Sequence, residues 1–438
     1  MKKIVSMLLL AALIMGMMSG CGNGDTSDTA SGDDISASED NASASDDSSA
    51  ANGEKTKIRM TYWNSEETVA DMLAYLETAV PDVDIEFQFI DNTNYSTIVD
   101  TQLAAGEGPD IISEAPDSAL KHARLGYLED LTELAGNFSD AGNSVFTHED
   151  KVYALPGISW FEGIWYNKDL FEENNIELPK TFDEYIAVCK QFEELGIKPL
   201  AAGLKSWEPM LKNSMAFVTA EYLSTAEGKD FGSLYREGET TMDGTWNPYI
   251  EKWSEMITSG VYTTDMTGND HEQALEEFAT GNTAMFCSGP WDLEAIKAKN
   301  PELNLDMMPF YGTTESAGWL IGGPGGGYAL NAGSKNKEAA MKVLTAMATP
   351  EAQEALWKNN QGGSSYLKGA DFDMPEVYAG VQEAIKAGNV YCPWNEWGAA
   401  GGAHKDYGVE MQKYLLGEQD IAATLGNVDR IVKELLDK

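Results

Sequence analysis

Strand-like and helix-like segments alternate along this sequence from residue 58 onward. Residues 58–63 (Ile-Arg-Met-Thr-Tyr-Trp) have the pattern of a β-strand, and Ser65 then offers a cap for a helix with one apolar face. Pro81 ends that helix, and apolar residues at alternate positions over 85–89 mark a second strand. A strand, a helix and a strand in this order form the unit of a parallel sheet, which predicts an α/β fold.

The alternation continues toward the C-terminus and indicates more than one α/β unit. Thr181 and Glu184 have the spacing of a capping box, and Gly196 stands where the helix that follows should end. Asn247–Pro248 and Thr349–Pro350 each pair a capping residue with a proline suited to a first helical turn. Because no internal repeat is present, we expect two α/β lobes rather than a solenoid or a propeller.

The net charge of −41, from 71 acidic and 30 basic side chains, excludes two classes of partner. A nucleic-acid-binding surface needs clustered lysine and arginine, and an anionic membrane surface attracts basic rather than acidic proteins. We therefore expect no nucleic-acid partner and no docking of the folded chain on lipid head groups.

The N-terminus has the pattern of a bacterial secretory signal. Lys2 and Lys3 precede an apolar run over residues 4–18, which is shorter than the roughly 20 residues that a membrane-spanning helix needs. The run ends in Met-Ser-Gly-Cys, which resembles a lipobox with Cys21 as the lipidated first residue of the mature protein. We expect residues 1–21 to be a lipoprotein signal peptide and the lipid to anchor the protein at the extracellular face of the cytoplasmic membrane. An ordinary signal peptide with a chance cysteine is the alternative.

Residues 22–54 have the composition of a disordered tether. They contain nine acidic side chains, no lysine or arginine, and a single large apolar residue, Ile35. Such a segment cannot bury enough surface to offset the entropy that ordering would cost. We expect a flexible acidic linker that spans roughly 30 Å or more.

Motifs of catalysis are missing from the sequence, which contains no HExxH, no paired CxxC and no GxSxG. Three cysteines remain beyond Cys21, and Cys189, Cys287 and Cys392 fit packing roles better than a disulfide framework or a nucleophile. We therefore expect a protein that is not an enzyme.

Two segments imitate ligand-binding loops without completing them. Residues 265–276 partly match a calcium loop, but Asp270 stands at the position of the turn glycine, so a helix cap at Asn269 explains the stretch better. Gly322–Gly327 lacks the Gly-Lys-Ser/Thr of a phosphate loop. It either bends the chain between lobes or lets a ligand approach the backbone closely. We expect neither a metal nor a cofactor.

Six tryptophans stand beside Gly, Pro, Ser or Asn at the ends of elements, whereas Trp253 and Trp357 lie inside amphipathic helices. The six are Trp63, Trp160, Trp207, Trp291, Trp394 and Trp397. An apolar ring in a loop is costly unless something covers it, and open α/β sheets bind ligands where such loops gather. Aromatic faces flanked by Asn, Asp and Glu suit a sugar, whose C–H faces stack on rings while its hydroxyls need polar partners. Each single ring fits core packing equally well, but together they predict a carbohydrate site.

Five blocks of the sequence resemble extracellular solute-binding proteins of carbohydrate ABC transporters (solute-binding protein family 1). They are residues 108–112, 155–171, 178–184, 278–291 and 416–418, and their order and spacing cover nearly all of residues 58–438. Residues 197–203 with Trp207 are similar to the multiple-sugar and raffinose-type branch rather than to maltose binders.

The resemblance implies a two-lobed, periplasmic-binding-protein-like (type II) fold with a ligand cleft between the lobes. It assigns residues 55–159 and 313–360 to lobe 1, and residues 160–312 and 361–438 to lobe 2. It also implies ABC permease subunits as partners, a monomeric state and a sugar or oligosaccharide as the ligand.

Ligand-binding residues follow from the same resemblance. Trp291 matches the position of a sugar-stacking ring, and Trp160 and Trp207 match contact loops. Asn64, Glu66 and Glu114 follow strands after which family members bind hydroxyls, although an acid at Glu66 also suits a helix dipole. The remaining expected cleft residues, placed there by location alone, are Trp63, Trp394, Glu396 and Trp397.

The implied function is capture of a sugar by lobe closure and its delivery to an importer. Two alternatives remain, namely a secreted glycoside hydrolase and a cell-surface glycan-binding adhesin or sensor. The hydrolase would release products from oligosaccharides by paired carboxylates, and the adhesin would bind its target without lobe closure.

Overall fold

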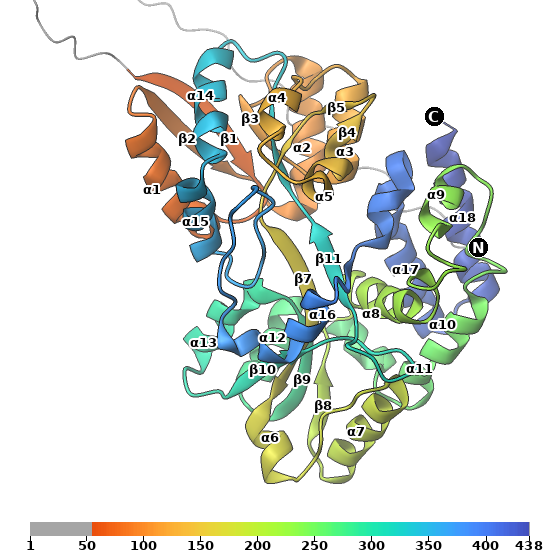
Figure 1. Cartoon of the computed structure of the whole chain (residues 1–438). Coiled ribbons are helices and arrows are strands. Elements are labelled where there is room, and N and C mark those ends of the chain that lie inside the picture. The colour runs from red at the N-terminus through yellow and green to blue at the C-terminus, as the bar shows by residue number, and fades with distance from the viewer. Residues whose placement is uncertain (1–54, 438) are drawn as a thin grey trace, which may run out of the picture. The chain divides into compact units, whose positions relative to one another are not determined.

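A computed structural model describes residues 55–437 and shows two lobes, each built around its own β-sheet (Figure 1). The expected signal peptide, Cys21 and the linker over residues 22–54 lie outside the described residues. Within residues 55–437, the helices are too short or too polar to form a membrane span.

Lobe 1 contains a five-stranded sheet with the order β2-β1-β3-β12-β6. β1 pairs in parallel with β2 and β3, as the strand–helix–strand pattern predicts, whereas β12 is antiparallel to both of its neighbours. The strands are β1 Thr56–Tyr62, β2 Val83–Phe89, β3 Ile111–Glu114, β6 Leu155–Pro156 and β12 Gly327–Leu330, with a small hairpin of β4 Thr147–His148 and β5 Lys151–Val152. The helices are α1 Ala70–Ala79, α2 Asn92–Ala105, α3 Pro116–Arg124, α4 Thr132–Ala135, α5 Asp140–Asn143, α14 Lys337–Met347 and α15 Pro350–Lys358.

Lobe 2 contains a sheet with the order β13-β11-β7-β9-β8, and β10 also pairs with β7. The strands are β7 Ser159–Asn167, β8 Lys198–Ala201, β9 Thr283–Ser288, β10 Leu305–Met308, β11 Leu320–Pro324 and β13 Val390–Tyr391. The helices are α6 Lys168–Glu173, α7 Phe182–Glu194, α8 Glu208–Val218, α9 Phe231–Arg236, α10 Asn247–Trp253, α11 Glu255–Thr258, α12 His271–Ala279, α13 Leu293–Lys299, α16 Gln382–Lys386, α17 His404–Leu415 and α18 Ile421–Leu436.

Each lobe has its own apolar core. In lobe 1, all four residues of the central strand β3 are buried, and the helices cover the sheet with Val69, Leu76 and Val343 among their buried side chains. Lobe 2 has two apolar clusters, one on each face of its sheet. The first includes Ile164 of β7 and Met285 of β9, and the second includes residues of β7 and β9 whose side chains lie on the opposite face. The sheet of lobe 2 is thus buried on both faces, as mixed sheets covered by helices are.

The chain crosses between the lobes three times. The first crossing joins β6 to β7, next to the boundary expected after residue 159. The second crosses from β11 to β12 at Gly325–Gly326, because β11 pairs with β7; the expected boundary at residue 313 lies too early. Leu367 belongs to the core of lobe 1 and Tyr378 to that of lobe 2, so the third crossing also lies beyond the expected residue 361.

The expected helix starts are confirmed where the capping side chain bonds a backbone N–H a few residues ahead. Thr181 accepts a hydrogen bond from the backbone of Glu184, and Thr349 accepts one from Ala352. Asn247 is the first residue of α10 instead of its cap, because its side-chain oxygen accepts a hydrogen bond from the Gly244 backbone. The cap of α12 is Asp270, which forms a capping box with Gln273, and the expected cap at Asn269 is wrong.

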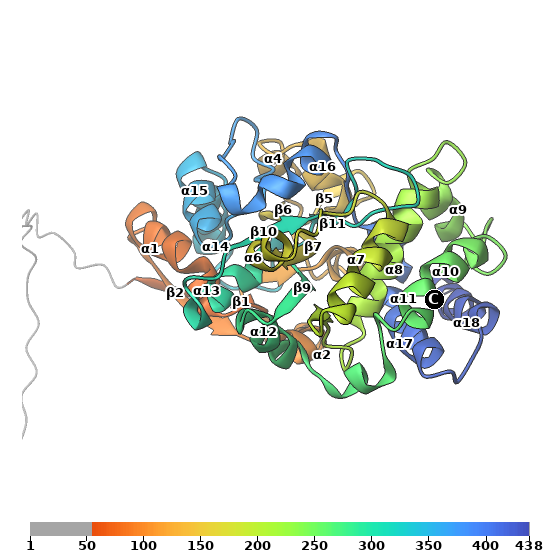
Figure 2. The same ribbon diagram turned by 90° about the horizontal axis from the view of Figure 1, so that it is seen from below.

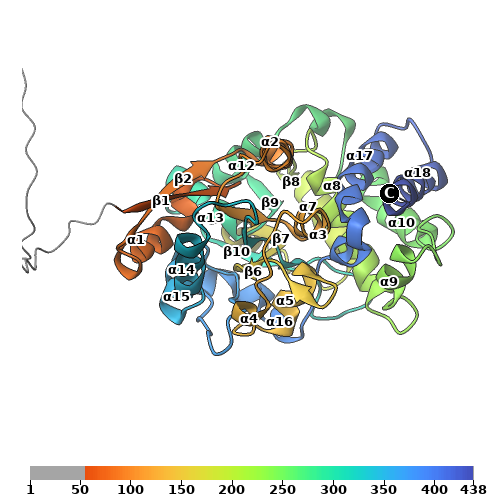
Figure 3. The same cartoon turned by 90° about the horizontal axis from the view of Figure 1, so that it is seen from above.

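The C-terminal part of lobe 2 is helical. Seen from below and from above, α9, α10, α17 and α18 gather on one side of the lobe (Figure 2, Figure 3). The 3-10 segment η7 (Pro393–Ala403), which is interrupted at Gly398, contacts α9, α17 and α18 and also touches α3 of lobe 1. This segment therefore brings the C-terminal helices to the boundary between the lobes.

Candidate functional site

A cavity of about 190 Å³ lies where the two lobes meet. On the lobe 1 side, the residue after β3 and the first turns of α3 line it through Ala115, Pro116, Asp117 and Leu120. On the lobe 2 side, β7, η7 and the starts of α8 and α17 line it, and the crossover loop contributes Pro324–Gly325. Because both lobes form its walls, the cavity changes shape when the lobes move relative to one another.

Four rings, which we call the aromatic wall, line the lobe 2 side of this cavity: Trp160, Trp394, His404 and Trp207. The ring centroids of Trp160 and Trp394 are 6.0 Å apart, and Trp394 stacks on His404 at 5.1 Å with an interplanar angle of 16°. His404 meets Trp207 edge-on at 5.4 Å. Trp291 adjoins the other end at 6.3 Å from Trp160, and 46% of its surface is exposed. Such faces can stack on the apolar face of a ligand.

The crossover loop makes room for the ring of Trp160. Trp160 lies on β7 opposite Gly323 of β11, and a Cβ atom on Gly325 would lie 2.4 Å from the Trp160 ring. A Cβ atom on Gly326 would lie 2.7 Å from the ring of Trp63. The glycines at these two positions therefore join the lobes and leave room for two aromatic rings of the protein beside the backbone. The first of the two roles expected for this loop, a connection between the lobes, is confirmed, and close approach of a ligand stays a prediction.

A buried lysine lies under the aromatic wall. Lys212 of α8 places its Nζ 2.7 Å from Glu162 Oε2 of β7 and 2.9 Å from Glu208 Oε2, one helical turn earlier. The same Nζ lies 5.7 Å from the ring centroid of Trp160 and 5.2 Å from that of Trp291. The ammonium thus bonds two carboxylates and also approaches two aromatic faces within cation–π range.

The environment fixes the charge of Lys212 and Glu208. Burial alone would lower the pKa of Lys212, but the carboxylates of Glu162 and Glu208 outweigh it and raise that pKa. The Lys212 charge lowers the pKa of Glu208, whereas burial raises the pKa of Glu162 against the same neighbour. Lys212 is therefore a permanent cation whose charge is already bound by protein carboxylates.

His404, which lines the cavity, has a defined tautomer. Its Nδ1 lies 2.7 Å from the carbonyl oxygen of Gly401 and must carry the hydrogen, because a carbonyl only accepts. Burial lowers the pKa of His404 and favours the neutral ring. In this tautomer Nε2 bears a lone pair, and it can accept a hydrogen bond from a hydroxyl donor.

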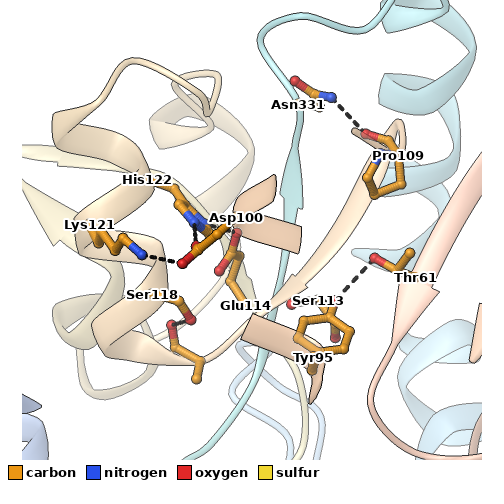
Figure 4. Close-up of polar contacts among 11 residues, drawn as sticks. Thr61, Tyr95, Asp100, Pro109, Ser113, Glu114, Ser118, Lys121, His122 and Asn331 are labelled. Carbon is orange, nitrogen blue, oxygen red and sulfur yellow. Dashed lines mark hydrogen bonds and ion pairs between the residues drawn. The ribbon is translucent and has the colours of Figure 1, made fainter. Parts of the chain in front are cut away.

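On the lobe 1 side, a buried cluster holds α3 against its lobe (Figure 4). His122 of α3 is 1% exposed; its Nδ1 lies 2.6 Å from Glu114 Oε1 at the end of β3, and its Nε2 lies 2.7 Å from Asp100 Oδ1 on α2. Lys121 also bonds Asp100, at 2.5 Å. The cluster fixes the helix that carries Asp117 into the cavity.

The charges of this cluster depend on one another. Burial would lower the pKa of His122, but the hydrogen bonds and charges of Glu114 and Asp100 raise it above its ordinary value of 6.5. Burial raises the pKa of Glu114, and His122 counteracts this. Burial works against Asp100 too, but Lys121 and His122 outweigh it and lower its pKa.

The structure brings three of the expected ligand residues together, since Trp160, Trp207 and Trp394 all line the cavity. Trp291 contacts Trp160 from outside the lining. Trp63 packs on the crossover loop and meets Tyr95 edge-on at 5.4 Å, on the lobe 1 side of the loop.

Two of the expected residues on η7, Trp397 and Glu396, do not line the cavity. Trp397 is completely buried in the lobe 2 core against Tyr235, because η7 turns it inward, so its expected place in the cleft is wrong. Glu396 turns toward α9, where a Cβ atom on Gly232 would lie 2.2 Å from its carboxylate, and it does not line the cavity.

On lobe 1, Glu114 bonds His122 in the interior instead of lining the cavity. Glu66 is an exposed residue in the first turn of a 3-10 helix, and Asn64 is partly buried just after β1; neither lines the cavity.

Four ionisable lining residues were not among those expected from the sequence, namely Asp117, Glu208, Lys212 and His404. Glu208 and Lys212 have the spacing of an ordinary helix-surface ion pair, and Asp117 that of a helix-dipole acid. The only sequence signal for them is that Glu208 and Lys212 follow Trp207 and that Asp117 follows the block Gly108–Ile112. Among the described residues, no group of three or more His, Cys, Asp and Glu side chains is arranged to hold a metal ion.

Two lobes with an aromatic cavity between them define a class of protein that encloses a small solute. Residues 62–354 match the family described as bacterial extracellular solute-binding protein, and the chain belongs to this family.

Curated relatives and solved structures agree with this assignment. The chain is 22% identical over 313 residues to the multiple sugar-binding protein of Streptococcus mutans serotype c, across 69% of this chain and 74% of the relative. It is 23% identical over 323 residues to the galactooligosaccharide-binding protein of Bacillus subtilis, across 69% and 71%.

The fold is similar to that of a family 1 extracellular solute-binding protein from Bifidobacterium longum subsp. infantis, with a TM-score of 0.70 and 23% identity. It is also similar to the solute-binding protein RafE in complex with raffinose, with a TM-score of 0.74 and 19% identity. In both comparisons 87% of this chain and 100% of the other are covered.

Proposed function

We propose that this protein is the substrate-binding component of an ABC importer, that its ligand is a sugar or oligosaccharide, and that it delivers this ligand to the permease subunits. The observation that carries the proposal is the aromatic wall in a cavity lined by both lobes. Relatives named for binding multiple sugars and galactooligosaccharides support the same class of ligand.

The cavity offers both kinds of contact that a sugar needs. The rings of Trp160 and Trp394 provide faces for C–H groups, and the free Nε2 of His404 and the carboxylates of Asp117 and Glu208 accept hydrogen bonds from hydroxyls. Because Asp117 belongs to lobe 1 and the rings to lobe 2, a sugar that contacts both favours the closed arrangement.

The location that we propose follows from the N-terminal sequence. Lipid on Cys21 would hold the protein, as a monomer, at the extracellular face of the cytoplasmic membrane, and residues 22–54 would separate the lobes from the bilayer. A Cys21→Ser variant is then expected in the medium, and parent protein in the membrane fraction with a mass increase of acyl chains. Release of parent and variant in equal amounts would contradict the anchor.

A thermal-shift screen of the purified protein tests the ligand class. We expect mono- or oligosaccharides to raise the melting temperature and amino acids or peptides to leave it unchanged; the reverse result would refute the carbohydrate proposal. Trp291→Ala should reduce the shift, with little effect on the unliganded melting temperature because the ring is half exposed. Trp357→Phe is the control, since Trp357 lies on α15, away from the cavity lining.

Binding without chemistry distinguishes this proposal from a glycoside hydrolase. On prolonged incubation we expect every bound oligosaccharide to be recovered intact by chromatography. Release of shorter products, abolished by substitution of Glu208 or Asp117, would favour the hydrolase instead.

A further inference from the structure

Two carboxylates face the cavity from opposite lobes. Asp117 lies in the first turn of α3 in lobe 1, and Glu208 is the first residue of α8 in lobe 2. Among the described residues that line the cavity, Lys212 is the only one with a permanent positive charge. Whether the net charge of the cavity lining is positive or negative therefore depends on how far the charge of Lys212 is balanced by its neighbours.

The charge of Lys212 is at least balanced by its own neighbours. Two of its three ammonium hydrogens face carboxylates, at 2.7 Å from Glu162 and 2.9 Å from Glu208. The lysine and its two partners together carry one net negative charge when both acids are ionised, and none when Glu162 is protonated. Asp117 adds a further negative charge in either case.

The groups behind this network do not reverse the sign. His271, whose charge acts on Glu162 and Glu208, is paired with Asp292 at 2.9 Å, so its positive charge has a carboxylate partner of its own. His404 donates Nδ1–H to a carbonyl, and its lowered pKa favours the neutral ring. The cavity lining is thus anionic, and an acidic group that approaches the remaining hydrogen of Lys212 must also approach the carboxylate of Glu208.

We propose that Asp117 and Glu208 are specificity-determining residues, which make the cavity accept uncharged sugars and exclude sugars that bear a carboxylate or sulfate group. This inference rests on the proposed function and deepens it, since it defines the ligand class by charge. A carboxylate that shares a partly desolvated cavity with two others is disfavoured by repulsion, whereas a hydroxyl can donate a hydrogen bond to the same oxygens.

Matched probes test the proposal by isothermal titration calorimetry. Maltotriose, raffinose and galactotriose are screened first; the tightest binder is then compared with its derivative oxidised at C6 to the uronate and with the methyl ester of that uronate. Ester and uronate have nearly the same shape and differ in charge. We expect the uronate to bind at least about tenfold more weakly than the ester at low salt, and the gap to narrow at high salt.

Variants identify the groups responsible. Asp117→Asn and Glu208→Gln should each reduce the ratio of the ester's affinity to the uronate's affinity severalfold, while Glu255→Gln should leave this ratio unchanged. Glu255 is a matched control, because it is a lobe 2 carboxylate that bonds a lysine, Lys252, at 2.9 Å away from the cavity lining. Circular dichroism melting curves establish that each variant folds.

The outcomes separate this inference from the proposed function. Equal affinity for uronate and ester, or a gap that persists in both Asp117→Asn and Glu208→Gln, would overturn the charge selection while leaving sugar binding intact. Failure of all three neutral sugars, with binding of a peptide or amino acid in the same assay, would overturn the proposed function and this inference with it.

Discussion

Lys212 connects the stability of lobe 2 to the cavity, because its partner Glu162 is only 3% exposed. Replacing the lysine with methionine would leave that carboxylate buried without a counter-charge. We expect Lys212→Met to lower the free energy of unfolding by about 3–5 kcal/mol in chemical denaturation. Adding Glu162→Gln should restore much of this loss, because the buried charge is then removed together with its partner.

Lys252, which is partly exposed, provides the control for this prediction. It bonds Asp183 and Glu255, whose side chains are 62% and 44% exposed. Ion pairs of that kind contribute about 0–1 kcal/mol, so Lys252→Met should have a small effect. Similar losses in the two lysine variants would show that Glu162 does not depend on Lys212.

His122 and Glu114 predict a pH dependence of stability. The pKa of His122 is raised in the folded chain, so its contribution is complete below about pH 6.5 and is lost as the pH rises through the folded value. The pKa of Glu114 is raised too, so the folded state disfavours its ionised form and stability again falls as the pH rises above about 4.5. The two signs agree.

We therefore expect the difference in unfolding free energy between the parent and the Glu114→Gln, His122→Gln double variant to decrease from pH 5 to pH 9. Urea denaturation at a series of pH values measures it. Neither glutamine titrates, so the variant supplies the baseline. A difference that grows with pH would contradict the directions assigned to both groups.

At the scale of elements, α3 and η7 form the contact that joins the lobes beside the cavity. A Cβ atom on Gly401 would lie 3.1 Å from the carbonyl oxygen of Trp394 and 3.2 Å from Asp117 Cβ. A larger side chain must therefore push α3 and η7 apart. We expect Gly401→Val to weaken sugar binding about tenfold, the cost of modest overpacking, as measured by calorimetry.

Gly268 is the matched position for this test. It is exposed in a 3-10 segment of lobe 2, its φ is not positive, and a Cβ atom there would meet nothing within 4 Å. Gly268→Val should bind sugar like the parent. Equal affinities of the Gly401 and Gly268 variants would mean that the contact between α3 and η7 takes no part in binding.

Local signals allowed the elements to be predicted better than the site. Thr181 and Thr349 cap their helices because a cap needs only a backbone donor two or three residues ahead. Trp160, Trp207 and Trp394 could be predicted as a group, because loop rings need cover. Lys212 could not, since its partner Glu162 lies 50 positions away and its charge balance exists only in the folded chain.

The lobes as a whole follow from the α/β pattern and the family resemblance, but their boundaries depend on strand pairing. β11 lies after the expected boundary at residue 313 and yet pairs with β7, because Leu320 and Ile321 have buried places on the two faces of the lobe 2 sheet. A short apolar strand carries no local sign of the sheet that it joins, and long-range register decides it.

At the scale of the whole molecule, we expect the two lobes to close on a bound sugar. In the absence of ligand, the contacts between the lobes beside the cavity involve α3, η7 and the crossover loop, and a sugar that contacts both Asp117 and the aromatic wall adds to them only in the closed arrangement. We expect the radius of gyration of the protein, measured by small-angle X-ray scattering, to fall when the tightest-binding sugar is added at saturation. Trp160→Ala, which removes a lobe 2 face, should show this fall only at higher sugar concentration, in proportion to its weaker affinity. A radius that stays constant while calorimetry shows saturation would favour a glycan-binding module without closure over the proposed importer component.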